Sequence, residues 1–141
     1  MKPQDKHLWD KFIETHPDYF ESVDYDVLVG EGMVFGDVTK NRYAADFQML
    51  TQKKIDVVGH KGDEAHIIEI KPNAGPTAFG QIVAYKQLWT KKYPEVSNVK
   101  MVVLTNEPQS DFEGIFAANG IELIKTGYCD KCRVPENYGR S

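Results

Sequence analysis

Asp56, Glu69 and Lys71 are residue types that could together hold a divalent metal ion and act on a phosphodiester. Carboxylate oxygens are the ligands that Mg²⁺ and Mn²⁺ prefer, and these ions keep several waters. An amine beside the carboxylates could assist the attacking water or counter the charge that develops on the phosphate. A Glu-x-Lys pattern alone is a weak signal, but an Asp thirteen residues earlier strengthens it.

The stretch that carries these residues is predicted to be a β-hairpin that ends at Pro72. Its first strand, its Gly-punctuated turn and its second strand are residues 55–58, 59–64 and 65–71. Side chains alternate along a strand, so Glu69 and Lys71 are expected on one face, with Ile68 and Ile70 on the other. A carboxylate and an ammonium in a nearly buried strand must be paired or must hold something charged.

A helix over residues 5–16 is predicted from the apolar stripe of Leu8, Trp9, Phe12 and Ile13, with Asp5 as its N-cap. Residues 25–29 and 43–50 are predicted to be strands, the second leading into the hairpin. Beyond the hairpin, Thr77 is the predicted N-cap of a helix over 78–92. The elements expected after it are a strand over 99–104, a helix over 110–118 and a strand over 121–124.

The resulting order, α-β-β-β-α-β-α-β, predicts a mixed α/β domain with helices on both sides of a central sheet. Residues 1–124 are expected to form this single domain, and residues 125–141 a C-terminal tail. Cys129 and Cys132 lie in that tail and are interpreted as reduced thiols, because a zinc site would need two more ligands. No apolar leader or membrane-spanning run is present in the sequence, which favours a cytoplasmic location.

The net charge of −4 argues against a nucleic-acid partner until its distribution is considered. Residues 1–39 carry a net charge of −6 and residues 101–141 a net charge of −2, whereas residues 40–100, which contain the hairpin, carry +4. A local basic field attracts phosphate whatever the whole-chain charge. A nucleic acid, DNA or RNA, is therefore an expected partner, unless the lysines of this segment are only solvated surface. The acidic first 39 residues could bind a protein partner or a second copy in a homo-oligomer.

The helix after the hairpin places Gln81 and Tyr85 one turn apart on the same side. Asp56, Glu69-Ile70-Lys71 and this Gln-x-x-x-Tyr helix together resemble the PD-(D/E)XK nuclease superfamily, and most closely its RecB-like and phage-exonuclease-like members. The sequence departs from the pattern in having Ile55 where the motif has Pro. The resemblance implies a restriction-endonuclease-like α-β-β-β-α-β core and metal-dependent hydrolysis of DNA, in phage or mobile-element DNA processing, repair or recombination.

By this resemblance, Asp56 and Glu69 would bind Mg²⁺ or Mn²⁺ and Lys71 would be the catalytic lysine. Gln81 and Tyr85 would help position the water or the DNA near the cleaved phosphate. Such families often add an acid from the first helix to the metal site. Glu14 is the candidate for that acid, and Asp10 the alternative.

Two other functions remain open at this stage. The same fold could serve as a non-catalytic module that binds nucleic acid or protein, or as an adaptor in which the charges only support packing. Metal binding separates the enzyme from both alternatives, because neither of them needs a divalent ion.

Overall fold

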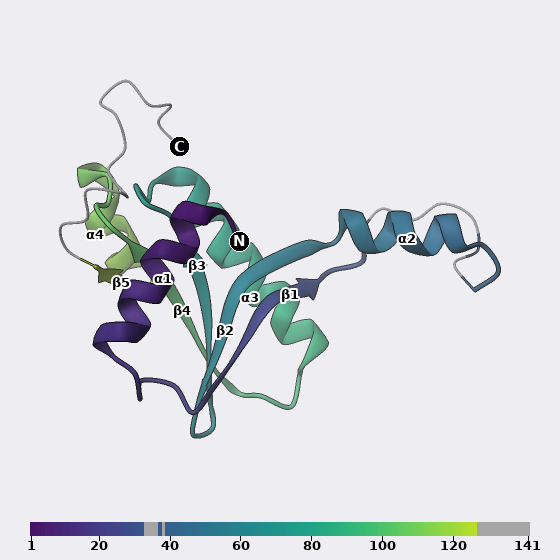
Figure 1. The fold of residues 1–141 in the computed structure, drawn as a ribbon, viewed down its shortest axis with the longest axis horizontal. Coiled ribbons are helices and arrows are strands. Elements are labelled where there is room, and N and C mark those ends of the chain that lie inside the picture. Colours follow the sequence, from purple (N-terminus) through teal and green to yellow (C-terminus); the bar gives the residue numbers. More distant parts are fainter. Residues whose placement is uncertain (33–36, 38, 127–141) are drawn as a thin grey trace.

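A five-stranded sheet forms the centre of the computed structural model, which describes residues 1–32, 37 and 39–126, apart from the side chains of residues 47 and 49–51. The strands lie across the sheet in chain order (Figure 1). Their bounds are β1 Ser22–Val29, β2 Lys53–Lys61, β3 Glu64–Ile70, β4 Asn98–Thr105 and β5 Ile121–Lys125. Because β1 to β3 pair antiparallel and β3 to β5 pair parallel, the sheet is mixed, as predicted.

Helices cover both faces of this sheet. α1 (Pro3–Thr15) covers one face, and α3 (Pro76–Lys92) and α4 (Ser110–Ala118) cover the other (Figure 1). The buried cluster beneath α1 consists of Leu8, Trp9, Phe12, Val57, Ile68, Ile70, Val102 and Leu104. The buried cluster beneath α3 and α4 includes Ile55, Val58, Ile67, Ala78, Ile82, Trp89, Val103 and Phe116.

The alternation predicted for β3 is confirmed. Ile67 packs toward α3, whereas Ile68 and Ile70 pack toward α1, so Glu69 lies on the α3 face. The backbone N–H of Lys71 donates to the carbonyl oxygen of Leu104 at 3.0 Å and thereby continues the ladder beyond the last residue of β3. Lys71 is thus held to β4 directly after the last residue of β3.

The prediction of a strand over residues 43–50 is wrong, because Arg42–Thr51 forms a helix, α2. Asn41 caps this helix: its side-chain oxygen accepts hydrogen bonds from the backbone N–H groups of Tyr43 at 2.9 Å and Ala44 at 3.4 Å. Arg42 and Asp46, one turn apart, approach to 3.8 Å. α2 projects from the body at the far end of the ribbon formed by β1 and β2 (Figure 1).

The predicted caps of two other helices, Asp5 and Thr77, are also wrong, because each of these helices begins earlier, at a proline. α1 begins at Pro3 after Lys2, and α3 begins at Pro76 after Gly75. Proline suits the first turn of a helix because its missing N–H would have no partner there. Asp5 and Thr77, the residues expected to cap, lie inside their helices.

The last strand ends at Lys125, one residue past the predicted domain boundary. The rest of the predicted tail, including Cys129 and Cys132, falls outside the described residues. In the part of the chain that the structure describes, none of the helices combines the length and the apolar character that crossing a membrane would require.

Candidate active site

The candidate residues meet where β2 separates from β3. The two strands pair from Lys61 opposite Glu64 as far as Val57 opposite Ile68. Beyond that point the backbone N–H of Ile70 donates to Oδ2 of Asp56 at 3.0 Å, so a side chain replaces the next backbone acceptor. Figure 1 shows the β1–β2 ribbon running away from β3 toward α2, which leaves a fork between the two strands.

β1 is distorted at the same level. Asp26 has a φ of +50°, in the left-handed region, and lies between the pairs Tyr25–Val57 and Val27–Ile55. Left-handed backbone is uncommon in residues other than glycine, although Asp tolerates it better than most. The distortion places Asp26 beside Asp56 on the neighbouring strand, where the ribbon leaves the sheet.

Asp56 and Glu69 form a hydrogen-bonded carboxyl pair in this fork. Glu69 is only 5% exposed, and burial followed by the charge of Asp56 raises its pKa to about 9, against the opposing effect of Lys71. Burial also raises the pKa of Asp56, although the hydrogen bonds from the Ile70 N–H and from Glu69 oppose the rise. Two carboxyl groups this close cannot both ionise easily, so the pair retains a proton.

Asp5 is a third acid at this site, and sequence reasoning missed its role. Its side chain is 9% exposed, and its pKa is raised by burial and then by the charge of Asp56, while Lys71 lowers it. The first turn of α1 therefore brings Asp5 to the carboxyl pair. It approaches from the face of the sheet that α1 covers, opposite the face that α3 covers. In the sequence, the available signal was an aspartate in line with the apolar stripe of the helix, three residues before Leu8.

Glu14, the predicted acid from this helix, does not join the group. It follows Asp5 by nine residues, which places it about 14 Å farther along α1 and on the opposite side of the helix. Its side chain is exposed. The alternative, Asp10, is exposed as well and accepts a hydrogen bond from the Lys6 ammonium at 2.8 Å.

Tyr85 reaches the carboxyl pair from α3. Burial raises the pKa of its hydroxyl, and the charges of Glu69 and Asp56 raise it further. Gln81 lies one turn earlier on α3, and its side-chain oxygen is buried without a hydrogen-bond partner. The predicted set of Asp56, Glu69, Lys71 and Tyr85 is thus gathered in one place, with Gln81 adjacent to it along the helix.

The two carboxyl groups of Asp56 and Glu69 fit a hard divalent cation in kind, because such ions bind oxygen ligands. Mg²⁺ is commonly bound by one or two carboxylates together with waters and substrate phosphates. Oε2 of Glu69 is buried and accepts no hydrogen bond, which leaves one carboxylate oxygen available as a ligand. Among the described residues, no three His, Cys, Asp or Glu side chains form a group that could hold a metal ion as they stand.

The basic residues of the central segment are less concentrated than their sequence suggested. Lys53 and Lys54 are exposed at the start of β2, near the fork. Lys61 lies at the other end of β2, where its ammonium is 4.4 Å from the centre of the Tyr19 ring. Lys92 donates to the carbonyl oxygen of Leu28 at 2.9 Å. The lysines that flank the carboxyl pair are therefore Lys53 and Lys54 at the start of β2 and Lys71 directly after β3.

Comparison of the sequence with protein-family models and with curated proteins found no match. Comparison of the structure with solved structures found similar folds. The protein of unknown function AF1548 shares 19% identity at a TM-score of 0.55, over 91% of this chain and 60% of that one. EndoMS in a complex with double-stranded DNA shares 14% identity at a TM-score of 0.50, over 89% of this chain and 45% of that one.

A repair endonuclease from Pyrococcus abyssi is similar to the same degree, with 16% identity and a TM-score of 0.50 over 85% of this chain and 46% of that one. The chain thus spans about half the length of the solved structures that it matches. At these identities the likeness concerns the fold. The chain has a mixed α/β, restriction-endonuclease-like fold, as its sequence predicted.

Proposed function

We propose that this protein is a metal-dependent nuclease that hydrolyses phosphodiester bonds in DNA, in DNA processing, repair or recombination. The observation that carries the proposal is the hydrogen-bonded Asp56–Glu69 pair, buried at a strand fork with Lys71 beside it. Two proteins with a similar fold add support, a repair endonuclease and EndoMS bound to double-stranded DNA.

Each residue has a distinct task in this proposal. Asp56 and Glu69 would hold Mg²⁺ or Mn²⁺, which would supply neutralisation of the phosphate charge and activation of water when bound. Lys71 would orient the attacking water and counter the negative charge that develops on the phosphate. The hydroxyl of Tyr85 would donate a hydrogen bond at the same place, and Asp5 would complete the acidic group from the other side.

The proton shared by Asp56 and Glu69 couples metal binding at this site to pH. Buried carboxyls without a cation keep a proton, because burial and mutual repulsion disfavour two negative charges. A divalent cation reverses this preference, because its charge favours both ionised carboxylates. Metal binding should therefore release protons, and binding should tighten as the pH rises.

Cleavage of a labelled DNA duplex and of a single strand in the presence of Mg²⁺ or Mn²⁺ tests the proposal. Asp56→Asn should abolish cleavage and Lys71→Ala should lower its rate by at least about 100-fold, because each removes charge that stabilises the transition state. Lys61→Ala is the matched control, since it makes the same change at an exposed lysine at the other end of β2. Unchanged cleavage by Lys71→Ala would exclude the proposed site.

Titration with Mn²⁺ by calorimetry separates the enzyme from a non-catalytic module. The nuclease requires a metal-binding signal in the wild-type protein that disappears in Asp56→Asn. DNA binding without metal binding, and without cleavage, would identify a binding module on the same fold.

A further inference from the structure

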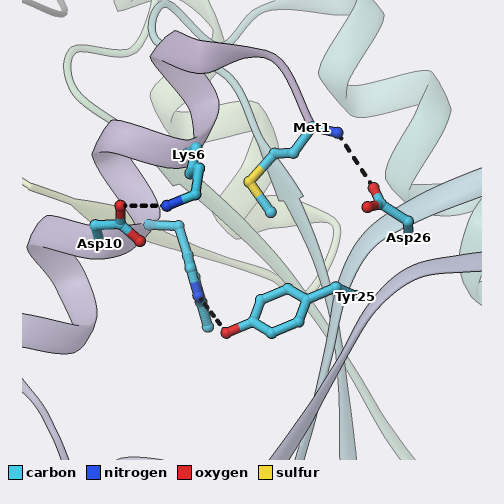
Figure 2. A pocket seen from close by; sticks show the side chains of 6 residues that line it. Met1, Lys6, Asp10, Tyr25 and Asp26 are labelled. Atoms are coloured by element: carbon cyan, nitrogen blue, oxygen red, sulfur yellow. Dashed lines mark hydrogen bonds and ion pairs between the residues drawn. The ribbon is translucent and has the colours of Figure 1, made fainter.

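A cavity of about 390 Å³ opens between α1 and β1, next to the candidate active site. Figure 2 shows the side chains that line it. They are Met1, Lys6, Trp9, Asp10, Tyr25 and Asp26. Its volume lies at the lower end of the range of about 300–1,000 Å³ that is usual for small-ligand pockets. The proposed hydrolytic chemistry does not use this cavity.

Tyr25 forms a fixed aromatic wall of the cavity. The indole N–H of Trp9 donates to the Tyr25 hydroxyl at 3.0 Å, and the two rings meet edge to face at 83°. Trp9 is 3% exposed, so its ring is held by the core, whereas Tyr25 remains 50% exposed. A rigid aromatic ring that stays half exposed can stack on a flat ligand with little loss of conformational freedom.

The polar groups around the cavity include both donors and acceptors, with no excess of either charge. Lys6 pairs with Asp10 at 2.8 Å and the amino group of Met1 pairs with Asp26 at 3.3 Å (Figure 2). A pocket in which two cations balance two carboxylates does not select a phosphate. The carboxylates can accept from amino groups and Lys6 can donate to a carbonyl, which are the groups on the edge of a nucleobase.

The cavity adjoins the candidate active site through two neighbouring residues. Asp26 lines the cavity and lies beside Asp56, between the strand pairs that bracket both residues. Asp5, which belongs to the acidic group, immediately precedes Lys6 on α1. A nucleotide whose phosphate reaches the carboxyl pair would therefore have its base, or that of a neighbouring nucleotide, near the mouth of the cavity.

We propose that this cavity receives one unpaired nucleobase of the strand that is cleaved, stacked on Tyr25 and hydrogen-bonded by Asp26 and Lys6. The proposal rests on the proposed function and narrows its substrate to nucleic acid with an unpaired base close to the cleaved bond. A paired base would first have to leave its stack and give up its partner, a free-energy cost that an unpaired base does not carry, so an unpaired base enters more readily. Stacking on an aromatic ring accepts any base, so selection by structure is expected rather than selection by sequence.

Binding of two short fluorescein-labelled duplexes tests the proposal in a chelator, where no strand is cut. One duplex is fully paired, and the other carries a single bulged 2-aminopurine. Tyr25→Leu should weaken binding of the bulged duplex about 5- to 150-fold and leave the paired duplex unchanged, because it removes the stacking surface. Tyr25→Phe should keep the preference for the bulge, and 2-aminopurine fluorescence should be quenched in the wild-type complex.

Tyr43→Leu is the matched control, because it makes the same change at a tyrosine that is 81% exposed on α2. It should leave the ratio of the two affinities unchanged. Equal weakening of both duplexes by Tyr25→Leu, no weakening of either, or no quenching in the wild-type complex would overturn the proposal. None of these outcomes bears on the proposed nuclease activity, which the cleavage assay with Lys71→Ala tests separately.

Discussion

The carboxyl groups at the two ends of the β2–β3 hairpin have partners of opposite kinds. At the turn end, Nε2 of His66 lies 3.0 Å from a Glu64 carboxylate oxygen, and Nε2 of His60 lies 2.9 Å from Asp24. The hydrogen bond with His66 is the main reason why the pKa of Glu64 is lowered. At the fork, by contrast, Asp56 and Glu69 bind each other, and their pKa values are raised.

The two buried or half-buried glutamates differ in whether their carboxyl oxygens have donors. Glu64 has a basic partner and also accepts a hydrogen bond from Asn98 at 3.4 Å. Glu69 is buried more deeply, yet one of its oxygens has no hydrogen-bond donor. Burying a carboxyl without a donor costs free energy, and such costs are typical of sites that are completed by something else.

The largest effect that distinguishes the two ends is the pH dependence of stability in the metal-free protein. Glu69 keeps its proton in the folded state up to a pKa of about 9, whereas an unfolded glutamate loses it near 4.5. Its contribution is fully present below pH 4.5 and is lost as the pH rises toward 9. From pH 5 to pH 8 the free energy of unfolding should fall by about 2–4 kcal/mol, measured by urea denaturation.

Glu69→Gln tests whether that one residue causes the fall. The amide cannot ionise, so the variant should be more stable than the wild-type protein at pH 8 and should show a clearly smaller fall in the free energy of unfolding over this range. Glu64→Gln makes the same change at the turn end and should keep the wild-type dependence. Identical pH profiles for the wild-type protein and Glu69→Gln would refute the comparison.

A smaller effect is expected from the acid on α1. Asp5→Asn should lower metal-dependent cleavage by about 10- to 100-fold, the loss that is usual when a group supporting the metal ligands is removed. Glu14→Gln should leave the rate unchanged, because Glu14 lies on the other side of the helix. Initial rates at saturating Mn²⁺ measure both variants, and the reverse order of effects would restore Glu14 as the third acid.

The smallest effect concerns the paired end. Glu64→Gln should shift the midpoint of thermal unfolding at pH 7 by no more than about 3 °C, because a partly exposed ion pair stabilises little. The contribution of Glu64 to stability should change with pH in the opposite direction to that of Glu69. The lowered pKa means that the stabilisation by Glu64 is present at neutral pH and is lost as the pH falls through the acid range. Thermal unfolding followed by circular dichroism at pH 4 and pH 7 measures this dependence. If the midpoint of Glu64→Gln at pH 7 were many degrees below that of the wild-type protein, the turn end would contribute more stability than proposed.

The elements with strong periodicity could be predicted from the sequence, and α2 could not. The apolar stripe of α1 and the alternation in β3 each follow from local geometry, so both were predicted correctly. Residues 43–50 carry aromatic and apolar side chains that suit a strand, yet Asn41 caps a helix there. The Asn41 cap pairs backbone N–H groups that would otherwise lack a partner at the helix start, which favours a helix over a weak strand preference.

Local sequence patterns were enough to predict the hairpin, the separation of Glu69 from Ile68 and Ile70 on opposite faces, and the helix that carries Gln81 and Tyr85. These features depend on residues near one another in the chain, where a period of 2 or 3.6 decides which side chains lie together. Three features could not be predicted in this way: Asp5 rather than Glu14 approaches Asp56, β2 leaves β3 at Asp56, and a cavity lies beside Tyr25. Each of these is set by pairing or packing between segments that are distant in sequence.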